Sequence, residues 1–171
     1  KEKEQGTFDQ LLVTPLSPAE ILIGKALPPM LIGLVQSMLL FCICYFWFQI
    51  PFSGTLGALI LTDIIFMLSS TGIGLSISAM ANNMQQVLVY AFVTMMPLVL
   101  LSGLATPVAN MPEFLQLLTY GDPLRFAIGA IRRIYLEGAG VSAVAADYVP
   151  MLLTAAVTMP LAGWLFRHKA V

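Results

Sequence analysis

Long uninterrupted stretches of apolar residues alternate with short polar breaks along most of this chain. A bilayer core of about 30 Å needs about 20 apolar residues in a helix, and four stretches are long enough to cross it. They cover about residues 27–48, 55–80, 87–104 and 148–166. The pattern therefore predicts an all-α integral membrane protein with four transmembrane helices, because lipid-exposed backbone must satisfy its own hydrogen bonds.

Two capping-box patterns precede the first span, each with a Ser or Thr followed three residues later by Gln or Glu. The second pattern, Ser17–Glu20, has Pro18 at the first helical position, where a missing N–H has no cost. The first pattern, Thr7–Gln10, starts a separate helix of about two turns, because Pro15 interrupts the chain after it. The sequence therefore predicts a short, capped helix set apart from the spans.

This short helix has an apolar edge formed by Phe8, Leu11 and Leu12, and a polar edge formed by Asp9 and Gln10. An amphipathic helix of this kind either lies flat in the membrane interface or docks into another protein. Composition alone leaves both interpretations open.

The long connection between the third and fourth spans contains two further helical patterns. Asn110 can cap a helix that Gly121 would end in a left-handed turn, and Asp122-Pro123 starts a second helix that ends before Gly138. Helices of about 9 and 15 residues reach roughly 14 and 22 Å. Because both are apolar but too short to cross, we predict a re-entrant or interfacial pair at about residues 111–137.

Composition supports the membrane assignment and argues against a soluble domain or a nucleic-acid-binding protein. The chain is 58% hydrophobic and 10% charged, with a mean hydropathy of +0.88, whereas soluble domains carry about 25% charged residues. The lipid bilayer is therefore its expected solvent. A net charge of −1 without a long basic run gives no basis for a nucleic-acid partner.

An even number of spans places both ends of the chain on one side. The positive-inside rule puts these ends in the cytoplasm, because five basic residues flank the outermost spans and three would lie outside. We therefore expect residues 1–26 to be a cytoplasmic segment and residues 27–171 the transmembrane domain. The chain lacks an initiating Met, and we expect it to be the C-terminal part of a longer protein. The inner basic residues are Lys1, Lys3, Lys25, Arg167 and Lys169, and the outer ones are Arg125, Arg132 and Arg133.

Candidate catalytic chemistry is sparse. The single histidine, His168, sits at the very end of the chain, so we expect no histidine-based triad or metal cluster, and Gly24-Lys25 lacks the remainder of a phosphate-binding loop. Cys42 and Cys44 point apart on a helix and are interpreted as small apolar side chains. We expect no enzyme activity, no metal site and no cofactor in this chain.

Asp63 is an ionisable residue inside the second predicted span, where it is costly unless it faces a cavity or another helix. Ser70 and Gly74 lie on nearly the same helix face, and the spacing Ser70, Gly74, Ser78 suits close helix packing. Asp63 either lines a substrate or ion path, or it bonds to a neighbouring helix or stays protonated. Ser37 in the first span is also expected to bond between helices.

The stretch GTFDQLLVTPLSPAEILIGK, residues 6–25, closely resembles the signature of ABC-2 type (type-2 ATP-binding-cassette) transporter permeases. Residues 98–112 and the segment Asp122-Pro123-Leu124-Arg125-Phe126 leading to Arg132 resemble the same family. The resemblance covers essentially the whole chain, and its nearest members are bacterial multidrug-type export permeases.

The resemblance implies a specific architecture and mechanism. Such permeases have six membrane helices, of which this chain would hold the last four, in the bacterial inner membrane. The short helix, with Thr7, Phe8, Asp9, Gln10, Leu11 and Leu12, would be a coupling helix that, with Ser17 and Glu20 following it, docks into a separate ATPase subunit carrying ATP and Mg. The outer pair, with Asp122, Pro123, Arg125 and Arg132, would be re-entrant helices near the outer gate.

The implied partners are the ATPase subunit, a second permease copy or a sister permease, and in some relatives a periplasmic adaptor. Two other functions remain open from the residues. One is a non-transporting membrane anchor or sensor that recruits an ATPase through the same helix. The other is an ion-coupled carrier that uses Asp63.

Overall fold

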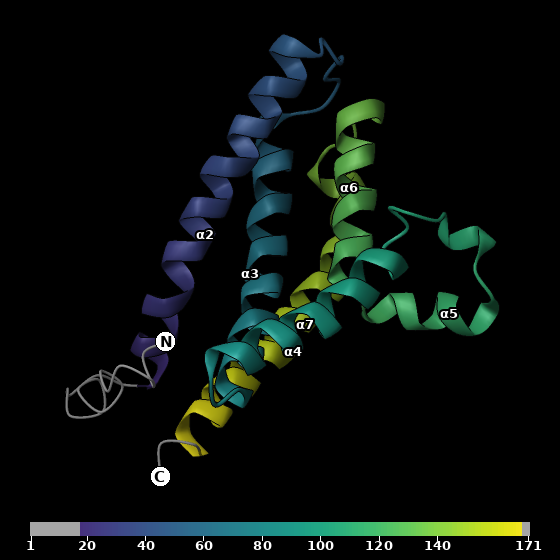
Figure 1. Cartoon of the computed structure of the whole chain (residues 1–171). Helices are drawn as coiled ribbons and strands as arrows, with labels where there is room; N and C mark the ends of the chain where they lie inside the picture. The colour runs from purple at the N-terminus through teal and green to yellow at the C-terminus, as the bar shows by residue number, and fades with distance from the viewer. Residues whose placement is uncertain (1–17, 169–171) are drawn as a thin grey trace.

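The structure is a computed structural model that describes residues 18–168, and every regular element within this range is helical (Figure 1). The predicted short helix, with Thr7, Phe8, Asp9, Gln10, Leu11 and Leu12, lies outside the described residues, as does Ser17. The helices are α2 (Pro18–Cys42), η1 (Ile43–Trp47, a π-helix that continues α2), α3 (Leu56–Met80), α4 (Met84–Leu101), η2 (Val108–Asn110), α5 (Glu113–Leu118), η3 (Thr119–Gly121), α6 (Pro123–Glu137) and α7 (Val141–His168).

Four of these helices are long and apolar enough to cross a membrane, as the sequence predicts. The candidate spans are Ile23–Trp47, Leu56–Met80, Met84–Leu101 and Val141–Leu165. Helix α2 includes Pro18, the predicted first helical position, and continues through Pro28 and Pro29 without a break. Proline is tolerated there because membrane helices can satisfy the freed backbone groups through neighbouring side chains and local adjustments.

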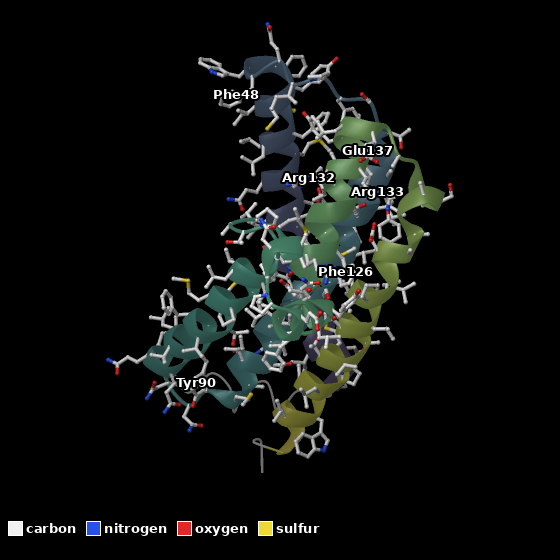
Figure 2. All side chains as sticks on the ribbon, turned by 90° about the vertical axis from the view of Figure 1, so that its right-hand side faces the viewer. Phe48, Tyr90, Phe126, Arg132, Arg133 and Glu137 are labelled. Carbon is white, nitrogen blue, oxygen red and sulfur yellow. The ribbon has the colours of Figure 1, made fainter. Side chains whose placement is uncertain are left out.

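The arrangement in space agrees with an even number of crossings. The N-terminal end of α2 and the C-terminal end of α7 lie at the same end of the bundle, which we call the terminal end (Figure 1). The chain passes from α2 to α3 and from α6 to α7 at the opposite end. Figure 2 shows Phe48 at this opposite end, with Glu137 of α6 near it and Phe126 near mid-height. Helix α6 therefore extends from the opposite end of the bundle to about its middle.

The core lies where α3, α6 and α7 meet. It contains nine buried apolar residues, with Phe41, Phe52 and other partly buried side chains packed against them. Small residues let α3 and α7 approach closely, since Ser69 Oγ donates to the Met151 carbonyl at 2.8 Å and Ser76 Oγ donates to the Thr158 carbonyl at 3.1 Å. The nine buried residues are Ala58, Leu59, Ile65, Ala127, Ala130, Ile134, Val144, Tyr148 and Met151.

The small residues that make this close contact differ from those that the spacing favoured. Gly72 faces α7, and a Cβ there would lie 2.2 Å from Thr158 Oγ1. Gly74 has open space around the same position, and Ser78 is exposed. Ser70, Gly74 and Ser78 therefore do not make the close contact with α7, and their packing against another helix stays a prediction. The stripe that packs is displaced by one or two positions, onto the face that includes Ser69, Gly72 and Ser76.

Aromatic residues mark the two ends of the bundle. Trp47 is 82% exposed at the end of η1, and Trp164 is 54% exposed near the end of α7. Tryptophan and tyrosine concentrate at the two water interfaces of membrane proteins. The two tryptophans of the chain therefore lie where a bilayer surrounding the bundle would meet water.

Candidate functional site

Two hollows lie along the seam between α2 and α3. They are separated where Gly33 of α2 meets Met67 of α3, because a Cβ on Gly33 would lie 2.9 Å from Met67 Cε. The hollow toward Phe41, which we call the Asp63 hollow, has a volume of about 210 Å³, and the one toward Pro29 has about 340 Å³. The Asp63 hollow is lined by Leu34, Ser37, Met38, Phe41, Leu59, Ile60 and Asp63.

Asp63 bridges the two helices at the Asp63 hollow. Its side chain is 8% exposed, and Ser37 Oγ of α2 donates a hydrogen bond to Asp63 Oδ2. This bond confirms the interpretation in which Asp63 bonds to a neighbouring helix, and it confirms that Ser37 bonds between helices. Asp63 also lines the hollow, so the bond does not remove it from a ligand path.

Ser70 and Gly74 line the second hollow together with Pro29, Met67, Thr71 and Leu75. Asp63, Ser70 and Gly74 therefore share the α2-facing side of α3, as their helical spacing predicts. They do not form one site, because the contact between Gly33 and Met67 lies between the two hollows.

The second group of candidate residues lies at the elbow between α5 and α6. Asp122 caps α6 by accepting a hydrogen bond from the Leu124 N–H at 2.9 Å, with Pro123 at the first helical position, as predicted. Arg125 donates to Thr119 Oγ1, and its guanidinium lies 4.6 Å from the centre of the Tyr120 ring. These contacts hold Arg125 against the elbow.

Two local predictions for this connection fail. Asn110 does not cap α5, because it belongs to η2 and Pro112 occupies the capping position without a side-chain bond. Gly121 does not adopt a left-handed conformation, because α5 continues into η3 and the chain turns at Asp122. Gly138 does end α6 in the left-handed region, with φ of +68°, as predicted.

Arg132 and Arg133 differ in their surroundings. Arg132 is exposed on α6 near the Phe48 end of the bundle (Figure 2). Arg133 pairs with Glu137 at 3.9 Å, as its spacing predicts, and with Asp147 of α7 at 3.2 Å. Sequence reasoning missed the pair with Asp147, because residues 14 apart show no helical spacing that would connect them.

Asp122 is an acidic group in an apolar setting. It is 1% exposed, and its Oδ2 atom is buried without a hydrogen-bond partner. Burial raises the pKa of Asp122 from 3.8 to about 6, an effect that outweighs the opposing N–H bonds of Leu124 and Arg125 and the Arg125 charge. The elbow therefore contains a carboxyl group whose pKa is raised by burial.

The Asp122 carboxyl makes a pH dependence of stability expected. Because its folded-state pKa lies above 3.8, its stabilising contribution is complete below pH 3.8 and is lost as the pH rises toward 6. Asp122→Asn keeps a capping oxygen and does not titrate. We expect the wild type to lose on the order of 1–2 kcal/mol relative to this variant between pH 4 and 7, allowing for solvent screening.

Thermal unfolding of the full-length protein in detergent at both pH values measures this difference. Glu113→Gln, which changes an exposed carboxylate on α5, is the control. Equal pH dependence in the wild type and in Asp122→Asn would show that Asp122 does not titrate in this range.

The described residues combine apolar helices with a few polar side chains placed between them. Among them, no group of three or more His, Cys, Asp or Glu side chains could hold a metal ion. They provide apolar helices, two hollows between helices and a charged elbow. This combination defines a multi-pass α-helical membrane protein with polar sites inside its helix bundle.

The chain belongs to the ABC-2 type transporter family, whose sequence profile matches residues 1–136. It is 41% identical over 171 residues to "Probable multidrug ABC transporter permease YbhR" of Escherichia coli K12, covering 100% of this chain and 46% of that protein. It is 30% identical over 169 residues to "Probable multidrug ABC transporter permease YbhS" of the same organism, covering 96% of this chain and 44% of that protein.

A third relative, "Inner membrane transport permease YhhJ" of Escherichia coli K12, is 27% identical over 168 residues, covering 98% of this chain and 45% of that protein. The chain thus spans about half the length of these curated relatives. No solved structure matches it significantly.

Proposed function

We propose that this chain forms part of the membrane-spanning subunit of an ABC-2 type exporter, which moves its substrate outward using ATP hydrolysed by a separate ATPase. The family match over residues 1–136, together with similarity along the whole chain to multidrug-type permeases, is the observation that carries the proposal. The four apolar helices support a location in the bacterial inner membrane.

In this proposal, the helix at residues 7–13 is the coupling helix. The capping box at Thr7–Gln10, with a second one at Ser17–Glu20 starting the next helix, favours a rigid element, which force transmission from an ATPase requires. Phe8, Leu11 and Leu12 supply an apolar edge that suits a hydrophobic cleft on a partner. Basic residues near the chain ends support a cytoplasmic location for this helix through the positive-inside rule. ATP and Mg would bind to the ATPase partner.

The proposal also assigns the outer region and the assembly. Helices α5 and α6 act as a re-entrant pair, which is supported by α6 reaching only to about the middle of the bundle (Figure 2). A second permease copy or a sister permease completes the transport path, and a periplasmic adaptor is a further partner in this proposal. The terminal end of the bundle, where the described chain begins and ends, then faces the cytoplasm.

Site-specific photo-crosslinking in cells tests this function on the full-length protein. A photoreactive residue replaces Phe8 or Leu12, and replacement of Phe48, which is 65% exposed at the other end of the bundle, is the matched control. We expect crosslinks from Phe8 and Leu12 to an ATP-binding-cassette ATPase, identified by mass spectrometry, and none from Phe48. Crosslinks to lipid alone would refute the coupling-helix assignment.

Two activity measurements separate the competing functions. Stimulation of ATP hydrolysis by substrate supports a permease, whereas a membrane anchor or sensor would show none. Export that continues when ATP hydrolysis is blocked would instead support an ion-coupled carrier.

A further inference from the structure

The Asp63 hollow, at the seam between α2 and α3, has a mostly apolar lining. Of its seven lining residues, five are apolar, and only Ser37 and Asp63 are polar. Its volume of about 210 Å³ exceeds the ~150 Å³ cavity that is known to admit benzene in another protein. The hollow can therefore admit a small organic group.

Among the described residues, the carboxyl group in this hollow has no ion-pair partner. Ser37 donates one hydrogen bond to Asp63, and no Lys or Arg among the described side chains pairs with it. An ionised carboxylate in an apolar setting is costly unless a proton or a positive charge compensates it. The hollow is thus complementary in charge to a cation.

The lining favours an organic cation over a metal ion. Calcium takes six to eight oxygen ligands and magnesium needs near-octahedral coordination, whereas only two side chains here carry oxygen. Phe41 contributes an aromatic ring to the lining, and this ring is held in place by Phe52 at 5.0 Å in an edge-on contact. Aromatic rings attract organic ammonium groups through their negative faces.

We propose that the Asp63 hollow between α2 and α3 binds the ammonium group of a small apolar organic cation, with Asp63 as its counter-ion. Leu34, Met38, Leu59 and Ile60 surround the apolar part of the ligand, and Phe41 lies beside its charge. This site is a property of the described residues and does not depend on the proposed export function.

Equilibrium binding of radiolabelled benzyltrimethylammonium to the purified full-length permease, without ATP, tests this site. Asp63→Asn removes the charge and keeps an oxygen for Ser37 to donate to. We expect this variant to weaken binding at least tenfold, while Glu113→Gln, at an exposed carboxylate on α5, leaves binding unchanged. The uncharged shape analogue neopentylbenzene is expected to compete equally poorly with the labelled ligand for binding to Asp63→Asn and to Glu113→Gln.

A second variant tests the same hollow by filling its space instead of removing its charge. Leu34→Trp fills the space without removing the carboxylate, and we expect it also to weaken binding at least tenfold. It keeps the test valid if Asp63→Asn fails to fold. The proposal is overturned if the wild type shows no saturable binding at millimolar ligand, or if both folded variants bind as the wild type does. Because no ATPase is present, failure here leaves the export proposal standing.

Discussion

Replacing Gly54 with alanine is expected to destabilise the fold by about 1–3 kcal/mol, the usual cost of overpacking. A Cβ at Gly54 would lie 2.2 Å from the backbone oxygen of Ile134, which cannot rotate away as a side chain could. Ile134 is fully buried in the core, and the neighbouring Ser53 N–H donates to the Tyr135 carbonyl at 3.1 Å. The added methyl group must therefore push the α2–α3 loop away from α6 and weaken this bond.

Gly57→Ala provides the matched control, because nothing lies within 4 Å of a Cβ there and the residue is in the first turn of α3. Alanine is the better helix former, so this variant should be neutral or slightly stabilising. The midpoint of thermal unfolding of the full-length protein in detergent gives the comparison. If Gly54→Ala unfolds at the same temperature as Gly57→Ala, the close approach of the loop to α6 is wrong.

The four spans could be predicted because bilayer-length apolar runs are directly visible in the sequence. Their ends were harder to predict, since α7 begins at Val141, seven residues before the predicted start. The segment before Tyr148 is less apolar than the rest of α7. It is helical where it contacts α6. Arg133 of α6 donates to the Ala143 carbonyl at 2.9 Å and pairs with Asp147, and no local pattern shows either contact.

The packing face of α3 could not be predicted for a different reason. In a membrane, the lipid-facing side and the core-facing side of a helix are both apolar, so hydrophobic periodicity does not distinguish them. Small residues occur on two faces of α3, one with Gly72 and one with Gly74. Only the structure shows that Gly72 faces α7 while Gly74 borders a hollow.

The backbone conformations of Gly121 and Gly138 differ, and they show how a neighbouring residue changes a turn. Both follow a helical pattern, but Pro123 restricts the residue before it to extended conformations. Asp122 accordingly has φ of −94° and ψ of 107°, and the chain turns there rather than at Gly121. Gly138 has no proline after it and takes the left-handed conformation, close to the Ser53 carbonyl. The site residues Asp122 and Pro123 could therefore be predicted more reliably than the glycine beside them.

The helix predicted at residues 7–13, which we propose as the coupling helix, carries the other large expected effect, and this effect concerns transport rather than stability. Leu12→Asp places a charge on the apolar edge that is proposed to dock into the ATPase. Burying an unpaired carboxylate costs several kcal/mol, and each 1.4 kcal/mol changes an equilibrium tenfold. We expect this variant to lower ATP-dependent export and substrate-stimulated ATP hydrolysis at least tenfold, while the permease still reaches the membrane.

Gln10→Glu adds the same charge two residues away, on the polar edge of the same helix, and is expected to lower both activities much less than Leu12→Asp does. Equal export by the two variants would mean that the apolar edge does not enter a hydrophobic cleft. Export and membrane level must be measured together, because loss of both would indicate misfolding. A loss of export in Leu12→Asp alone would show that the apolar edge of the predicted two-turn helix is needed to couple export to ATP hydrolysis.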